Sequence, residues 1–321
     1  MKLFSTVIVA AVATILASAA SAQSFPNKPI RLVVPFTPGS STDITARAVG
    51  ERLSAALGQP VVVENRPGAG GKIGGEIVAN AAPDGHTLLV NSSAHTANPA
   101  LYKDMPFNTA TAFAGVTPLV NLPNVLIIAP SKNIKTVQEL VTYAKAKSGQ
   151  LNFASAGVGS ATHMNAEKFS ARAGITHTHI PYKGTPEAMT DVMEGRVDVF
   201  FAPVNAALAN IQAGKFVTLA VGSAQRSEIL PNVPTTQEAG VKDSAYNFWV
   251  GMLAPSRTPR DIINKLNEET VKALQGPELT ARFKALGAAA WPMKPEAFDA
   301  YIKDEIASIA DIVKTAKIEL N

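Results

Sequence analysis

A short pattern recurs along this chain and limits the folds open to it: a buried strand, a loop of small residues, and the start of a helix. The apolar run Ile30–Phe36 predicts a strand, and apolar residues at helical spacing between Ile44 and Leu57 predict a helix. The same order returns as strand Leu151–Ser155 and helix Ala161–Ala173. Alternation of this kind predicts an α/β fold with mainly parallel sheets flanked by helices.

The loops between these strands and helices predict an anion site. We call Thr37–Asp43 the first jaw and Ser155–His163 the second jaw. The first-turn amides of a helix have no partner inside it, and the helix dipole is positive at that end. Small residues such as Gly39 let an anion approach the backbone. The alternative is an ordinary capped turn, because Ser40 and Asp43 have the spacing of a capping box.

The first 22 residues have the features of a cleaved signal peptide. Lys2 precedes the apolar run Val7–Leu16, and Ala20–Ala22 fits the small-x-small cleavage rule, so the mature chain is predicted to start at Gln23. An uncleaved anchor helix is the alternative, although the run is short of the ~18 residues that a membrane span needs. The chain has no cysteine, which excludes disulfides and thiolate chemistry. These features predict a periplasmic protein.

Without residues 1–22 the chain has 321 − 22 = 299 residues, enough for two domains. We predict domain one over 23–123 plus 225–321, and domain two over 124–224. The net charge is only +4, and no dense basic cluster predicts nucleic-acid binding. The glycine-rich turn at 65–71 has neither phosphate-loop nor dinucleotide spacing, so no cofactor is predicted.

Signals for catalysis are weak. The sequence contains no G-x-S-x-G, S-x-x-K or H-E-x-x-H motif. His177 and His179 would share a face of a strand and could hold a metal, but no third ligand is nearby in sequence, so no metal is predicted. A periplasmic hydrolase or isomerase is the alternative, and it lacks a nameable pair of nucleophile and base. The sequence therefore favours a binding protein over an enzyme.

Several motifs, in order along the mature chain, together carry a resemblance to a known family. They are Val34–Asp43, Glu64–Gly71, Pro83–Leu89, Ser155–His163, Pro181–Gly184, Leu230–Thr235 and Leu253–Pro259. These motifs resemble the extracytoplasmic solute receptors of tripartite tricarboxylate transporters, the Bug or TctC family. The resemblance implies a two-domain periplasmic binding protein of type II, with the ligand cleft between its domains. It also implies capture of a small di-, tri- or aromatic carboxylate for a membrane permease with a large and a small subunit; a receptor feeding a sensor kinase is the alternative.

The jaws and the resemblance together predict a set of ligand-binding residues. They are Phe36, Thr37, Pro38, Gly39, Ser40, Ser41, Thr42, Asp43, Asn65, Gly70, Ser93, Ser155, Gly157, Val158, Gly159, Ser160, Ala161, Thr162, His163, Tyr182, Ala202 and Pro203. In two places the chain departs from the family. Gly39-Ser40 stands where members often have two glycines, and Ala202 stands where many have an acidic residue. The second departure predicts a ligand without an ammonium group. We also expect Ser160→Ala and Thr162→Ala to weaken binding with little effect on the stability of the ligand-free protein.

Overall fold

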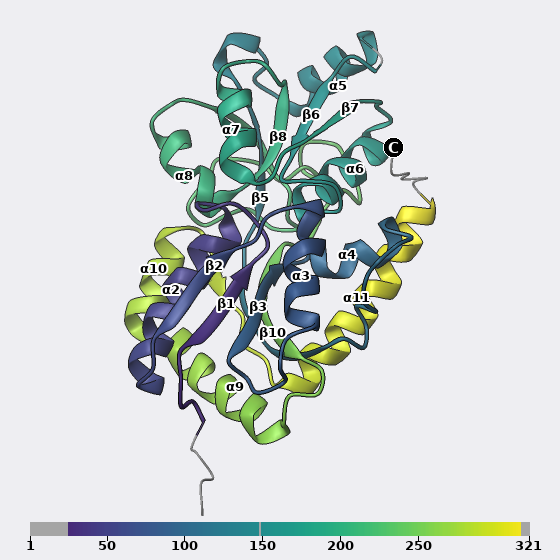
Figure 1. Ribbon diagram of the computed structural model, residues 1–321. Helices are drawn as coiled ribbons and strands as arrows, with labels where there is room; N and C mark the ends of the chain where they lie inside the picture. The colour runs from purple at the N-terminus through teal and green to yellow at the C-terminus, as the bar shows by residue number, and fades with distance from the viewer. Residues whose placement is uncertain (1–24, 148, 316–321) are drawn as a thin grey trace, which may run out of the picture.

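The structure, a computed structural model, describes residues 25–147 and 149–315 and consists of two lobes, each built on one sheet (Figure 1). The predicted signal peptide, residues 1–22, lies outside the described residues. Within the described part of the chain, no helix is long and apolar enough to cross a membrane.

The first lobe contains a six-stranded sheet in the order β11-β4-β10-β3-β1-β2. Its strands are β1 (Ile30–Val34), β2 (Val61–Asn65), β3 (Thr87–Ser92), β4 (Phe113–Asn121), β10 (Trp249–Pro255) and β11 (Ala289–Ala290). β1 pairs in parallel with β2 and β3, with Leu32 opposite Val63 and Leu88. β10 runs antiparallel to both β3 and β4. Leu32 and Val33 are fully buried although they point to opposite faces, so both faces of the sheet are covered.

The second lobe contains a five-stranded sheet in the order β7-β6-β8-β5-β9. Its strands are β5 (Asn124–Ile128), β6 (Asn152–Ser155), β7 (Thr178–Pro181), β8 (Val199–Pro203) and β9 (Val217–Val221). β6 is parallel to β7 and β8, whereas β5 is antiparallel to β8 and β9. The expected parallel pairing thus holds for part of each sheet. β5 and β10 run the other way because each enters its sheet directly after the chain crosses between the lobes.

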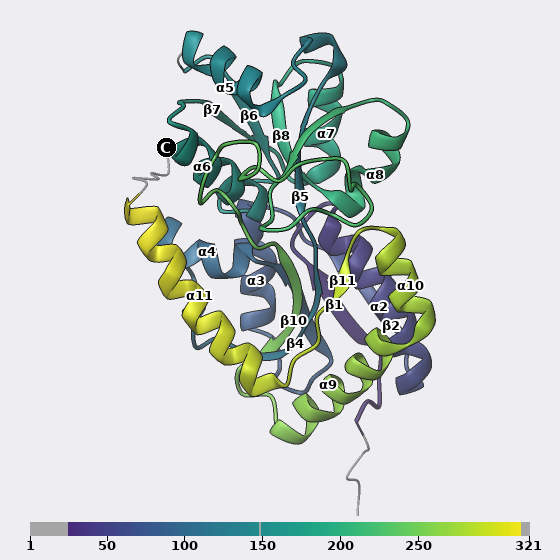
Figure 2. The same cartoon turned by 180° about the vertical axis from the view of Figure 1, so that it is seen from behind.

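Helices cover the faces of both sheets (Figures 1 and 2). The first lobe has α2 (Ser41–Leu57), α3 (Lys72–Ala79), α4 (Ala94–Leu101), α9 (Arg260–Gln275), α10 (Pro277–Ala285) and α11 (Pro295–Thr315). The second has α5 (Val137–Ala146), α6 (Ala161–Ala173), α7 (Thr185–Met193) and α8 (Val204–Gln212). Short 3-10 turns lie at Ala69–Gly71 and Pro130–Lys132. Of these elements, β4, β11 and α4 were not predicted from the sequence.

The chain crosses between the lobes twice, at 121–124 and between β9 and β10. After β9 it first stays with the second lobe: Thr235 bridges to Val221, and Ala239 and Val241 pack into the core that contains Phe153. The domain ranges predicted from the sequence stay a prediction, and these contacts favour placing 235–241 with the second lobe. Parallel strands of both sheets end toward the other lobe, where α/β proteins place their ligands.

Candidate functional site

The two jaws face one another across a cavity between the lobes. From the first lobe it is lined by Phe36, Ser40, Ser41, Thr42 and Ser92; from the second by Ala156, Ser160, Ala161, Thr162, Thr185 and Pro203; and from the second crossing by Phe248. It holds about 250 Å³ of space between atoms, part of it open to solvent. None of these lining residues carries a charge. The geometry therefore suits a small ligand held by neutral groups.

Several helices begin at this cavity. Ser41, Ala161 and Thr185 are the first residues of α2, α6 and α7, and Pro203 directly precedes α8. The amide of Ile44 donates to the carbonyl of Ser40, so the α2 amides before it have no acceptor earlier in the helix. The positive ends of four helix dipoles thus meet at one place, which favours an anion without a cationic side chain.

Two serine hydroxyls of the first jaw have no partner. Ser40 and Ser41 are each 2% exposed, and neither Oγ forms a hydrogen bond within the described part of the chain. The expected capping box is wrong in detail: the Ser40 side chain makes no cap bond, and the Asp43 carboxylate accepts from the Gly39 amide at 2.9 Å. Both hydroxyls lie at the cavity and are available to a ligand, whereas a buried hydroxyl left unpaired is costly.

Asp43 and Asn65 fix the loop of the first jaw through hydrogen bonds. Asp43 Oδ2 accepts from Arg47 Nε at 3.0 Å, and Asp43 Oδ1 accepts from Asn65 Nδ2 at 2.9 Å. Asn65 Nδ2 also donates to the carbonyl of Phe36 at 3.0 Å. Burial raises the pKa of Asp43, but the bonds from Arg47, the Gly39 amide and Asn65 outweigh it and lower the pKa overall. The carboxylate is therefore charged and shapes the loop, and its bonds are made within the first lobe.

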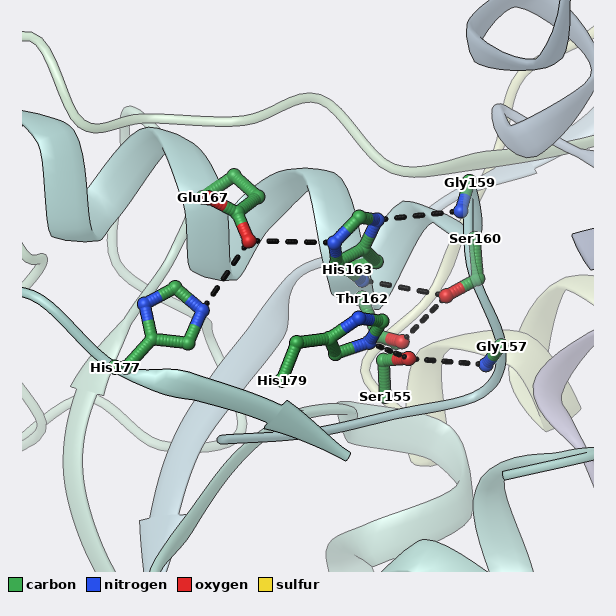
Figure 3. Close-up of polar contacts among 9 residues, drawn as sticks. All are labelled: Ser155, Gly157, Gly159, Ser160, Thr162, His163, Glu167, His177 and His179. Carbon is green, nitrogen blue, oxygen red and sulfur yellow. Dashed lines mark hydrogen bonds and ion pairs between the residues drawn. The ribbon is translucent and has the colours of Figure 1, made fainter. Parts of the chain in front are cut away.

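The hydroxyls of the second jaw, in contrast, have partners (Figure 3). Ser160 Oγ accepts from the His163 amide at 3.2 Å and lies 2.9 Å from Thr162 Oγ1. Thr162 Oγ1 in turn accepts from the Ala156 amide at 2.9 Å. Ser160 and Thr162 therefore both line the cavity and hold the loop, so the expectation that replacing them spares stability does not fit their bonds.

Direct contacts join the lobes around the cavity. Thr37 Oγ1 donates to Glu187 Oε2 at 3.0 Å, and Tyr102 Oη donates to the carbonyl of Val158 at 3.0 Å. A Cβ added to Gly70 would lie 1.8 Å from that same carbonyl oxygen. The lobes are therefore in a closed arrangement, with backbone packed on backbone across the cleft.

Comparison with known proteins identifies the family. The profile of the tripartite tricarboxylate transporter family receptor matches residues 45–318. The chain belongs to this receptor family, as the sequence predicted.

Solved structures agree with this assignment and confirm the two-domain fold class. The periplasmic binding protein BugD is 34% identical, with a TM-score of 0.88 over 92% of this chain and 99% of its own. An R. palustris protein solved with adipate is 32% identical, with a TM-score of 0.89 over 92% and 99%. MatC from Rhodopseudomonas palustris, solved with bound malate, is 32% identical, with a TM-score of 0.86 over 90% and 100%.

In this receptor the other predicted residues lie around the cavity rather than on its wall. Pro38 and Gly39 are exposed, Ala202 is fully buried, and none of the three lines the cavity. Ser93 is buried at the start of α4 and is not part of the lining. Ser155, Gly159 and His163 belong to the second jaw but form hydrogen bonds within its loop and do not line the cavity. An outer cavity of about 790 Å³, solvent included, contains the rest: Gly70, Gly157, Val158 and Tyr182.

Four lining residues were absent from the predicted list. Ser92 and Thr185 lie at a strand end and a helix start, so the signal that identified the jaws was present for them too. Ala156 falls within the second jaw. Phe248 arrives from the second crossing, and nothing in its local sequence points to the cavity.

Proposed function

We propose that this protein is an exported, periplasmic receptor that captures a small di-, tri- or aromatic carboxylate without an ammonium group. It delivers this ligand to a membrane permease with a large and a small subunit. The observation that carries the proposal is the uncharged cavity between the jaws, where the unpartnered hydroxyls of Ser40 and Ser41 meet four helix N-termini. The adipate and malate bound to two related structures support the ligand class.

The lining also argues against amino acids. An ammonium group taken out of water needs an acidic partner, because a buried unpaired charge is costly. The described lining offers no carboxylate, and Pro203 stands beside Ala202 at the position where many members carry an acid. A carboxylate, in contrast, is satisfied by amides and hydroxyls.

Neutral donors suffice for useful affinity. A micromolar ligand corresponds to about 8 kcal/mol of binding free energy. Each hydrogen bond to a charged group contributes roughly 1.5–3 kcal/mol, while association costs several kcal/mol. Two free serine hydroxyls, together with first-turn amides from α2 and α6, provide enough donors for this range.

The test is a thermal-shift screen of the chain 23–321 against mono-, di-, tri- and aromatic carboxylates and amino acids. Ligand at 100 times its dissociation constant stabilises by about 2.7 kcal/mol, which raises the melting temperature measurably. We expect shifts from one carboxylate class and none from the amino acid of matching carbon skeleton, such as aspartate beside succinate. Recovery of the ligand unchanged would argue against an enzyme. Preference for the amino acid, or no response to any carboxylate, would contradict the proposal.

A further inference from the structure

A cluster of three histidines and one glutamate lies beside the loop of the second jaw and includes one residue of that jaw, His163 (Figure 3). His163 and Glu167 come from α6, His179 from β7, and His177 from the residue just before β7. The side chains of His163 and His177 are only 4% and 6% exposed. The cluster touches the loop of the jaw but does not line the cavity.

Glu167 fixes which nitrogen of His163 carries hydrogen. One oxygen, Glu167 Oε1, lies 3.3 Å from His163 Nε2 and 3.2 Å from His177 Nε2. Burial raises the pKa of Glu167, but its bonds to the two imidazoles outweigh this and lower the pKa strongly, so it is ionised. Since a carboxylate can only accept, both Nε2 atoms must donate. In neutral His163 this leaves Nδ1 with a lone pair, and Nδ1 accepts from the Gly159 amide at 3.2 Å.

His179 supports the other end of the same loop. Its ring stacks on that of His163 with centroids 3.9 Å apart and an angle of 18° between the rings. His179 Nε2 lies 2.6 Å from Ser155 Oγ, which accepts from the Gly157 amide at 3.0 Å. Burial and the neighbouring His163 lower the pKa of His179 to about 3, so it stays neutral near pH 7.

We propose that His163 and Glu167 are positioning residues for ligand binding, and that they hold the second jaw in its binding shape only while His163 Nδ1 is unprotonated. A proton on Nδ1 would face the Gly159 N–H, so two donors would meet where one hydrogen bond existed. The loop would then shift and move Ser160 and the α6 amides away from the ligand. Acid should therefore weaken binding. This inference rests on the proposed function of the cavity.

Three other titratable side chains form the cluster around His163. They are Glu167 on its own helix, His179 stacked on its ring, and His177 across Glu167. Tyr102, at the end of α4, bonds to the neighbouring Val158 carbonyl and is uncharged near neutral pH, because burial raises its pKa. Near pH 7, Glu167 is therefore ionised, whereas Tyr102 and His179 are neutral.

Two substitutions of His163 separate a positioning role from a packing role. One keeps an aromatic ring, and the other keeps a hydrogen-bond acceptor. His163→Phe keeps a ring to stack on His179 but loses the acceptor for Gly159. His163→Asn keeps an oxygen near the place of Nδ1 and has no group that gains a proton. His177→Phe is the matched control, because His177 shares Glu167 but forms no hydrogen bond to the loop within the described part of the chain. Circular dichroism and melting temperature establish that each variant is folded.

Calorimetric titration with malate and with adipate from pH 5.5 to 7.5 measures the effect. We expect His163→Phe to weaken binding about tenfold at pH 7.5, the loss of roughly one hydrogen bond. His163→Asn should bind within about threefold of the wild type, with a flatter pH profile, and His177→Phe should bind like the wild type. Unchanged affinity and pH profile in His163→Phe would overturn the proposal.

A second measurement does not depend on the ligand. Nitrogen-15 spectra of the ligand-free protein follow the His163 ring and the Gly159 amide as the pH is lowered. The proposal requires that neutral His163 carries its hydrogen on Nε2. It also requires that the Gly159 amide signal shifts with the same pH midpoint as the signals of the His163 ring. If neither malate nor adipate binds, the choice of ligand fails while this titration still decides the positioning role. A Gly159 signal that ignores the His163 titration contradicts that role.

Discussion

At the scale of single residues, serines that look alike in the sequence differ in their bonds. Ser41 Oγ has no partner, whereas Ser160 Oγ caps α6 by accepting from the His163 amide. We predict that Ser41→Ala leaves the unfolding free energy of the ligand-free protein within about 0.5 kcal/mol but weakens ligand binding roughly tenfold. Ser160→Ala should weaken binding and also cost about 1 kcal/mol of stability through the lost cap. Denaturant unfolding and calorimetry measure both, and equal stability losses would contradict this assignment.

Asp43 gives a residue-scale prediction about pH. Its pKa is lower in the folded protein than in the unfolded chain, so it adds stability above the unfolded value of about 4. That contribution is lost as the pH falls through the folded pKa. Asp43→Asn should lower the unfolding free energy at pH 7 by about 1–3 kcal/mol. The difference from the wild type should shrink below pH 4 in urea unfolding; a gap that stays constant down to pH 2 would refute the charge-based role.

At the scale of elements, local signals decide what the sequence reveals. Helix α6 was predicted with its observed bounds, and Thr136 caps α5 as expected, because periodicity and caps are local. β4 was missed: it contains Gly115 and Pro118, and its pairing with β10 comes from more than 100 residues away in the chain. The jaws were predictable for the same local reason, whereas the partners of Asp43 and His163 depend on tertiary contacts.

A partly buried carboxylate, that of Glu305, helps to attach helix α11 to the first lobe. Glu305 Oε2 accepts from Trp249 Nε1 and Thr96 Oγ1, each at 2.8 Å, and Oε1 accepts from Tyr301 Oη at 2.7 Å. We predict that Glu305→Ala lowers the unfolding free energy by about 3 kcal/mol, because it leaves the Trp249 N–H buried without an acceptor. Glu296→Ala, at an exposed position of the same helix, should change it by less than about 0.5 kcal/mol. If both variants lose a similar amount of unfolding free energy, the hydrogen bond from Trp249 to Glu305 does not stabilise the fold.

At the scale of the whole molecule, binding depends on how the lobes approach one another. They are joined by two crossings, and the cavity forms only where the jaws meet. The contacts Thr37–Glu187 and Tyr102–Val158 form only when the lobes are together, so they stabilise closure independently of the ligand. Ligand affinity therefore reports both the bonds in the cavity and the free energy of closing.

Gly184, the residue before α7, allows closure to be tested on its own. Its φ of −173° is extended backbone open to any residue, but an added Cβ would lie 1.9 Å from Thr37 Oγ1 on the other lobe. We predict that Gly184→Ala leaves the melting temperature of the ligand-free protein unchanged while weakening carboxylate binding at least about tenfold. Small-angle scattering should show that the ligand no longer compacts the variant. Adding Thr37→Ala removes the clashing oxygen and should restore part of the affinity, whereas Thr37→Ala alone should have a smaller effect than Gly184→Ala. If Gly184→Ala binds and compacts like the wild type, the lobes do not need to meet at this contact for the ligand to be held.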